Sequence, residues 1–340
     1  MKKASAYFPI FVSVLLCLAT FSSSALSVFT PKETEPTASV NSSGIGGRPL
    51  KDYISSVYVG DTSSSAESQA VSANRSDAIG RISEQFLSPY SAKLSYGGVY
   101  IKNTTGLTVV IKKELSESLK FKIEKGKEPQ VLILHTHATE CYMEEDRDFY
   151  TAADKSRTTD NSKNVTEIGE IIAKKLESGG ISVIHDRTQH DHPSYNQSYS
   201  RAAETIKEYL DKYPSIKIVV DVHRDSIAIT GNDKAKPTVT VNGKKAAQVM
   251  LVVGCEAGTV TGFPNWRENF RLALKYQQTM EVLYPGLART MAFAPRRYNM
   301  NLTTGSMLLE VGTDSNSFEE AKYSAELAGD ALLSLLNTLK

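Results

Sequence analysis

The feature that most constrains this fold is the alternation of short apolar runs with amphipathic periods after residue 129. Apolar runs rich in β-branched residues predict buried strands, and apolar residues at helical spacing predict helices between them. The strands are predicted at residues 131–134, 182–185, 216–222, 249–253 and 307–311, and the helices at 165–177, 199–210, 265–283 and 318–339. A hairpin is expected to turn at Asn242 and Gly243. This alternation predicts an α/β domain, a mostly parallel sheet covered by helices on both faces.

Histidine and glutamate side chains follow three of these strands. In doubly wound sheets the first and third strands are neighbours, and ligands gather at the carboxyl ends. The first strand runs into His135 and His137, the third into His223, and the last ends around Glu310. Because distant parts of the chain bring metal-ligating residue types to one edge, the sequence predicts a metal site there.

The spacing of His137 and Glu140 allows both to reach one cation, and His223 supplies a third ligand. Catalytic zinc takes three such ligands and leaves one position for water. Glu310 is then the expected general base and acid. On an extended chain His135 shares a face with His137, so it is either the first ligand in place of His137 or a donor to the tetrahedral oxyanion.

Neighbouring residues have supporting roles in this hypothesis. Asp221 or Asp225 could orient His223. Substrate carboxylates have candidate partners in Arg224 and in the pair Arg296 and Arg297. The residues after the second strand are expected to be polar loop residues rather than a second metal site; they are His185, Asp186, His190, Asp191 and His192. Cys141 has no assigned base, and a Cys141–Cys255 disulfide is possible outside the cytoplasm.

The first 128 residues have a different character. Lys2 and Lys3 precede an uncharged run over residues 4–30 that is long enough to span a bilayer. We therefore expect a cytoplasmic tip and transmembrane anchor at residues 1–30, with a cleaved signal peptide as the alternative. A flexible Ser- and Thr-rich linker follows at 31–74, then an N-terminal extension at 75–128 packed on the main domain, with a helical period at 75–86. Either reading makes the domain at 129–340 extracytoplasmic, and an anchored chain is a single-pass cell-membrane protein.

Composition gives no support for nucleic-acid binding, because 39 basic residues balance 38 acidic ones. The three cysteines lack the paired spacing of a disulfide framework.

Three motifs together resemble the stage II sporulation protein P family. They are His135-Thr136-His137-x-x-Glu140-x-Tyr142, Asp-Val-His-Arg-Asp at residues 221–225, and Gly-Ser-Met-Leu-Leu-Glu-Val-Gly at 305–312. The resemblance covers about residue 100 to the C-terminus, and more distantly the domain is similar to zinc-dependent N-acetylmuramoyl-L-alanine amidases. It implies zinc, cleavage of the amide between glycan and stem peptide in septal peptidoglycan during engulfment, and endopeptidase action on cross-links. It also implies two partners, the lytic transglycosylase stage II sporulation protein D and the membrane scaffold stage II sporulation protein M.

One departure from the amidases concerns the second ligand. Those enzymes take a glutamate from the start of the helix after the first strand, whereas residues 161–164 here read Asn-Ser-Lys-Asn. Glu140 replaces it, as in carboxypeptidase-like sites. Two alternatives stay open at this point: a carboxypeptidase-like zinc hydrolase of peptides, and a non-catalytic wall-binding scaffold.

Overall fold

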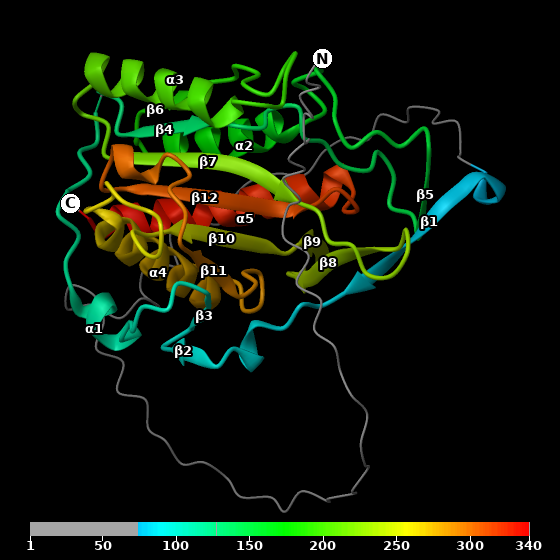
Figure 1. Ribbon diagram of the computed structural model, residues 1–340, viewed down its shortest axis with the longest axis horizontal. Helices are drawn as coiled ribbons and strands as arrows, with labels where there is room; N and C mark the ends of the chain where they lie inside the picture. The colour runs from blue at the N-terminus through cyan, green and yellow to red at the C-terminus, as the bar shows by residue number, and fades with distance from the viewer. Residues whose placement is uncertain (1–73, 127, 340) are drawn as a thin grey trace, which may run out of the picture. The chain divides into compact units, whose positions relative to one another are not determined.

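The computed structural model describes residues 74–126 and 128–339 and has a mixed α/β fold (Figure 1). The anchor predicted at residues 1–30 and the linker predicted at 31–74 lie outside the described residues, apart from Asn74. Within the described ranges, no helix combines the length and apolarity that crossing a bilayer requires.

The larger sheet has eight strands in the order β2-β3-β11-β10-β12-β7-β4-β6. Its β2–β3 and β10–β12 pairs are antiparallel, and the other neighbouring pairs are parallel. The prediction of a mostly parallel sheet is therefore confirmed, as is the pairing of the first and third predicted strands, β4 and β7. The strands are β2 (Leu94–Tyr96), β3 (Val99–Asn103), β4 (Val131–Leu134), β6 (Val183–His185), β7 (Ile218–Asp225), β10 (Val249–Gly254), β11 (Met291–Ala294) and β12 (Ser306–Thr313).

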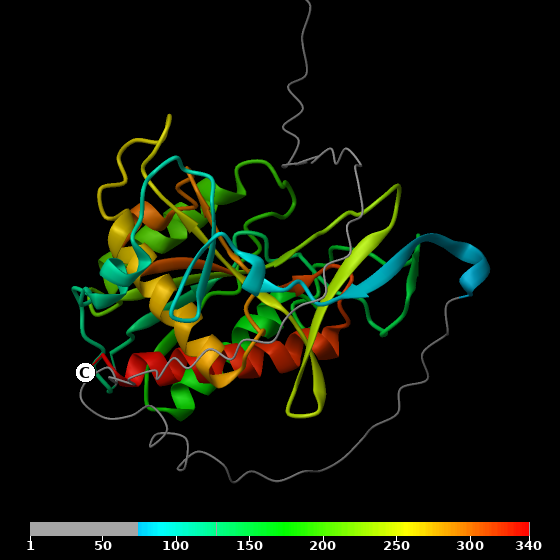
Figure 2. The same cartoon turned by 90° about the horizontal axis from the view of Figure 1, so that it is seen from below.

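Helices cover both faces of this sheet. The larger apolar core lies under α2, α4 and α5, whereas α3 covers a smaller core on the opposite face. In this smaller core, Leu132 and Leu134 of β4 lie beside Val219 of β7. In Figure 2, α5 runs in red along one side of the sheet. The helices are α1 (Ile111–Ser116), α2 (Val165–Ser178), α3 (Ser198–Lys212), α4 (Trp266–Leu283) and α5 (Phe318–Asn337), with short 3-10 turns η2 (Arg75–Asp77), η3 (Pro89–Ser91) and η4 (Met300–Leu302).

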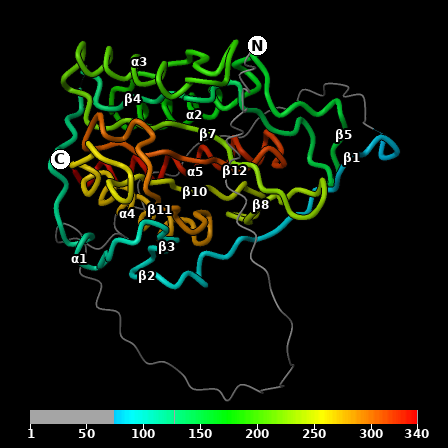
Figure 3. The backbone as a smooth tube through the Cα atoms, viewed as in Figure 1, coloured from blue at the N-terminus to red at the C-terminus, as the bar shows by residue number. Residues whose placement is uncertain are grey.

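A second sheet, in the order β5-β1-β8-β9, lies to the right of the larger sheet in the view of Figures 1 and 3. It contains β1 (Ala78–Gln85), β5 (Phe149–Thr151), β8 (Lys234–Val241) and β9 (Lys244–Ala247). The β8–β9 hairpin turns at Asn242 and Gly243, both with positive φ, as predicted.

The prediction of a helical period over residues 75–86 is wrong. After one 3-10 turn, this segment is strand β1, which pairs with β8 and β5. Ile82 is buried, whereas Ile79 is 48 % exposed. Pairing with two strands distant in sequence therefore overrides the local helical spacing. Residues 75–128 also contribute β3, which pairs with β11, so this segment completes the main sheet.

Strands β4, β7 and β12 are parallel, so their carboxyl ends lie at one edge of the sheet. His137 and Glu140 follow β4, while His223 and Glu310 lie near the ends of β7 and β12. The topology thus brings together the residues that the sequence marks as candidates.

Candidate metal centre

The turn after β4 is held in place by a carboxylate on the neighbouring strand. The backbone N–H of Thr136 donates to Asp221 Oδ1 at 2.8 Å, and the Thr136 hydroxyl donates to Asp221 Oδ2 at 2.6 Å. The N–H of Glu140 then donates to the carbonyl of His137 at 3.1 Å, which closes the turn. This turn directs His137 and Glu140 toward the end of β7.

The structure brings His137, Glu140 and His223 together, and all three are buried. One donor atom from each lies within 4.8 Å of the others. Glu140 Oε1 is 3.4 Å from His137 Nδ1, and Glu140 Oε2 is 3.4 Å from His223 Nδ1. Two ligands about 2.0–2.1 Å from a tetrahedral zinc ion are separated by roughly 3.3–3.4 Å. The three residues therefore have the chemistry of zinc ligands, and the distance from Glu140 to each histidine matches this spacing.

Glu140 is held as a carboxylate. Burial alone would raise the pKa of Glu140, but His137, His223 and the charge of Arg224 hold it well below its ordinary value. The Arg224 backbone N–H lies 3.3 Å from Oε2, and Arg157 Nη2 lies 3.3 Å from Oε1. An ionised, buried carboxylate between two imidazoles suits a cation.

Asp221 positions His223. Its Oδ1 lies 2.9 Å from His223 Nε2, which leaves Nδ1 facing Glu140. Burial lowers the pKa of His223, but the charges of Asp221 and Glu140 outweigh it and raise that pKa well above its ordinary value. Of the two orienting residues considered from the sequence, the structure selects Asp221, because Asp225 instead pairs with Arg289 at 3.0 Å.

Glu310 lies beside this cluster but is not part of it. It is paired with His223 in the β12–β7 register, so both side chains project from the same face. Glu310 Oε2 is buried and has no hydrogen-bond partner among the described residues. Burial raises the pKa of Glu310 to about 8, against the lowering effect of the His223 charge. A carboxyl group in this state can take up a proton near neutral pH.

His135 does not share a face with His137, contrary to expectation, because β4 ends at Leu134 and the chain turns. Its Nδ1 contacts the carbonyl of Val222 at 2.9 Å, and its Nε2 lies 3.0 Å from His185 Nε2. Burial lowers the pKa of His135 to about 3. Both ring nitrogens of His135 therefore contact groups outside the His137–Glu140–His223 cluster. The sequence left open whether His135 or His137 is the first candidate ligand, and the structure places His137 in the cluster.

Aromatic residues form one wall of the site. The Tyr195 ring stacks on His137 at a centroid distance of 4.7 Å, and the Tyr199 ring meets it edge-on at 5.5 Å. Arg157 lies 5.0 Å from the centre of the Tyr195 ring. Tyr199 lies in the first turn of α3 and Tyr195 precedes that helix, so the chain brings both rings to His137 where α3 begins.

Arg157 is the site residue that the sequence did not suggest. It contacts Glu140, Tyr195 and, through a short hydrogen bond, Asp191. It lies in a long loop without a motif, so no local pattern identifies it. Asp191 also accepts from the Thr139 hydroxyl at 2.5 Å, which makes it a polar loop residue as expected.

The two described cysteines have no part in this chemistry. Cys141 and Cys255 are both buried and free, so the possible disulfide between them is absent. Burial raises the pKa of the Cys141 thiol to about 11, and its Sγ donates to the carbonyl of Lys155 at 3.0 Å. A protonated thiol of this kind is a poor nucleophile.

The fold and site define a mixed α/β protein with a His–Glu–His candidate metal centre at the carboxyl ends of parallel strands. The family model of stage II sporulation protein P matches residues 60–333, and the chain belongs to that family. This confirms the resemblance seen in the motifs. Stage II sporulation protein P of Bacillus subtilis (strain 168) is 30 % identical over 217 residues, covering 60 % of this chain and 50 % of that protein. The chain thus spans about half the length of this curated relative.

Solved amidase structures are remotely similar. The N-acetylmuramoyl-L-alanine amidase AmiC2 of Nostoc punctiforme is 12 % identical with a TM-score of 0.35, covering 62 % of this chain and 99 % of the amidase. The CwlD amidase from Clostridioides difficile, solved in complex with the GerS lipoprotein, is 14 % identical with a TM-score of 0.38, covering 62 % of this chain and 98 % of CwlD.

Proposed function

We propose that this chain is a zinc-dependent peptidoglycan hydrolase of sporulation that cleaves the N-acetylmuramoyl-L-alanine amide. The observation that carries the proposal is a buried His–Glu–His cluster beside Glu310, an acid outside the ligand set. A purely structural metal site has no need of such an acid. Family membership supports the sporulation setting, and the motif resemblance supports the peptidoglycan substrate.

His137, Glu140 and His223 would hold the zinc ion, and Asp221 would keep His223 in the tautomer that offers Nδ1. Zinc, when bound, polarises the scissile carbonyl and lowers the pKa of a water molecule. Glu310 accepts the proton of the attacking water and passes it to the leaving amine. Its place suits both steps, because Glu310 is paired with His223 in the β12–β7 register and its buried Oε2 has no hydrogen-bond partner among the described residues.

The proposal extends to the cellular setting. Residues 1–30 anchor the chain in the cell membrane, and the domain acts outside the cytoplasm on septal wall during engulfment. Peptide cross-links are a second substrate, and stage II sporulation proteins D and M are the partners.

The test is digestion of purified sacculi by the full chain. Glu310→Ala should retain stoichiometric zinc and lose activity by a factor of about 10²–10⁴, because a general base is removed and the ligands stay. His223→Ala and treatment with a chelator should remove both zinc and activity. Glu319→Ala is the matched control, since Glu319 is an exposed glutamate in the first turn of α5.

Mass spectrometry of the released fragments separates the alternatives. Free stem peptides indicate amidase action, and cut cross-links indicate endopeptidase action. Undiminished turnover by Glu310→Ala would refute its role. A wild-type chain that binds zinc and sacculi but releases no fragment would favour the scaffold.

A further inference from the structure

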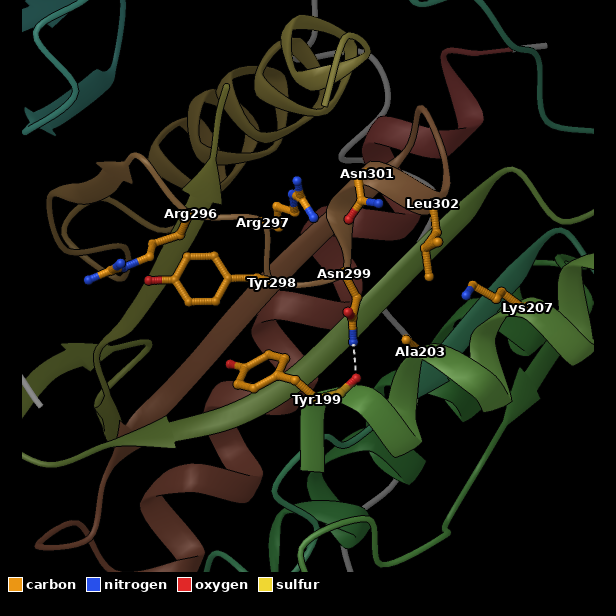
Figure 4. Close-up of a pocket in the computed structure, with 9 residues that line it drawn as sticks. All are labelled: Tyr199, Ala203, Lys207, Arg296, Arg297, Tyr298, Asn299, Asn301 and Leu302. Carbon is orange, nitrogen blue, oxygen red and sulfur yellow. Dashed lines mark hydrogen bonds between the residues drawn. The ribbon is translucent and has the colours of Figure 1, made fainter. Parts of the chain in front are cut away.

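A cavity of about 410 Å³ is lined in part by Tyr199, whose ring also contacts His137. Figure 4 shows its lining residues. We call it the basic cavity. One wall is α3, and the other is the segment between β11 and β12. Its lining residues are Tyr199, Ala203, Lys207, Arg296, Arg297, Tyr298, Asn299, Asn301 and Leu302.

The lining carries three cations and no carboxylate. Neither Lys207 nor Arg296 forms an ion pair with any residue that the structure describes, and both are exposed. Arg297 is hydrogen-bonded to the carbonyl of Thr261, which leaves its charge uncompensated. In Figure 4, Arg296 and Lys207 lie at opposite ends of the cavity, so its positive charge is spread along it. An elongated ligand with more than one separated anionic group suits this arrangement better than a single compact anion.

Tyrosines connect the basic cavity to the metal ligands. The ring of Tyr199 is 5.5 Å from that of His137 and 6.1 Å from that of Tyr298. In Figure 4 the guanidinium of Arg296 lies next to the Tyr298 hydroxyl. A ligand in the cavity would therefore have its Arg296 end close to the reacting bond.

The wall that carries the arginines is fixed in place. Tyr298 and Asn299 both have left-handed backbone angles, with φ of 48° and 58°. The Asn299 side-chain amide donates to the carbonyl of Tyr199 at 2.8 Å, and Asn269 Nδ2 donates to the carbonyl of Met300 at 2.7 Å. Two successive non-glycine residues in this conformation are costly, and such strain persists where the surrounding structure holds it, often at binding sites.

We propose that the basic cavity binds the stem peptide through its carboxylates, with Arg296 nearest the scissile amide and Lys207 farther along the peptide. This assignment rests on the proposed function for the identity of the peptide. It names Arg296 and Lys207 as residues that determine specificity. Peptides with free carboxylates are then preferred over the same peptides carrying carboxamides.

The test is calorimetric titration of the full chain with two synthetic stem tetrapeptides, one with free carboxylates and one with all carboxyl groups amidated. Both lack the glycan, so neither has the amide that the amidase cuts. Wild-type protein should bind the free form at least about tenfold more tightly, and added salt should reduce the difference. Arg296→Gln should weaken binding of the free form about tenfold and Lys207→Gln about threefold. Lys212→Gln is the control, an exposed lysine on the same helix outside the cavity.

Equal affinity for the two peptides would overturn the proposal, as would wild-type affinity in both cavity variants with unchanged circular dichroism. Carboxylate-dependent binding by a chain that releases nothing from sacculi would support the cavity assignment and refute the hydrolase. Digestion of sacculi by a chain that binds both peptides equally would support the hydrolase and overturn the cavity assignment. The two proposals therefore fail separately.

Discussion

Asp221 Oδ1 lies 2.9 Å from His223 Nε2, on a side chain whose two oxygens also accept hydrogen bonds from Thr136. One carboxylate thus orients a candidate ligand on its own strand and fixes the turn that carries the other two ligands. Because Asp221 is buried, water cannot replace these contacts. The candidate metal centre therefore depends on Asp221, although Asp221 is not one of the three candidate ligands.

Asp221→Asn should weaken zinc binding by about 10–100-fold while the fold is retained. The amide keeps one acceptor oxygen, but it removes the charge that faces His223 Nε2 or places an N–H group where Asp221 accepts from Thr136. Competition with a chromogenic chelator measures the affinity. Asp225→Asn is the control, since Asp225 lies on the same strand and pairs with Arg289. An Asp221→Asn protein with wild-type zinc affinity would show that Asp221 does not orient His223.

The meeting of the three candidate ligands could be predicted from the sequence because it depends on a simple geometric rule. His137, Glu140 and His223 follow the ends of apolar strands, and neighbouring parallel strands end at one edge of a sheet. Glu310 follows from the same rule through the β12–β7 pairing. Strand pattern alone was enough for these residues.

Other features depend on contacts that no local pattern encodes. His135 faces away from His137 because β4 ends at Leu134 and the chain turns over residues 136–139, whereas a shared face needs an extended chain through His137. Arg157 reaches Glu140 from a loop whose course is set by tertiary hydrogen bonds. Residues 78–85 form a strand because β8 and β5 pair with them, although their apolar spacing suits a helix. In each case a partner distant in sequence decides the outcome.

The stabilising contribution of ionised Glu170 should be lost as the pH falls. Burial alone would raise the pKa of Glu170, but hydrogen bonds with His185, Arg187 and Lys174 lower it from 4.5 to about 2. A carboxyl group with a depressed folded-state pKa stabilises the fold above its unfolded pKa, and this contribution is lost as the pH falls from about 4.5 toward 2.

The variant Glu170→Gln lacks this titration. The difference in unfolding free energy between wild type and Glu170→Gln should be about 1–2 kcal/mol at pH 7, allowing for partial solvent screening, and should shrink below pH 4.5. Urea denaturation across pH 3–7 gives the values. Glu177→Gln, at an exposed position on the same helix, should show a small and flat difference. A constant difference for Glu170→Gln over the whole range would contradict the assignment.

Gly169 on α2 gives a test of the packing behind the metal centre. A Cβ atom there would lie 2.6 Å from the His135 ring and 2.8 Å from His185 Nε2.

Alanine in a helix gains about 0.5–1 kcal/mol over glycine, but overpacking a buried site costs about 1–3 kcal/mol. The two rings contact each other at 3.0 Å and His135 is fully buried, so neither can move without losing a hydrogen bond. The clash therefore outweighs the helix propensity, and Gly169→Ala should lower the free energy of unfolding by about 1–2 kcal/mol in urea titrations at pH 7. Gly126→Ala is the control, because a Cβ there meets nothing within 4 Å, and its change should stay within about 0.5 kcal/mol. A Gly169→Ala protein more stable than wild type would mean that the His135 and His185 rings can move apart to accommodate the added methyl group.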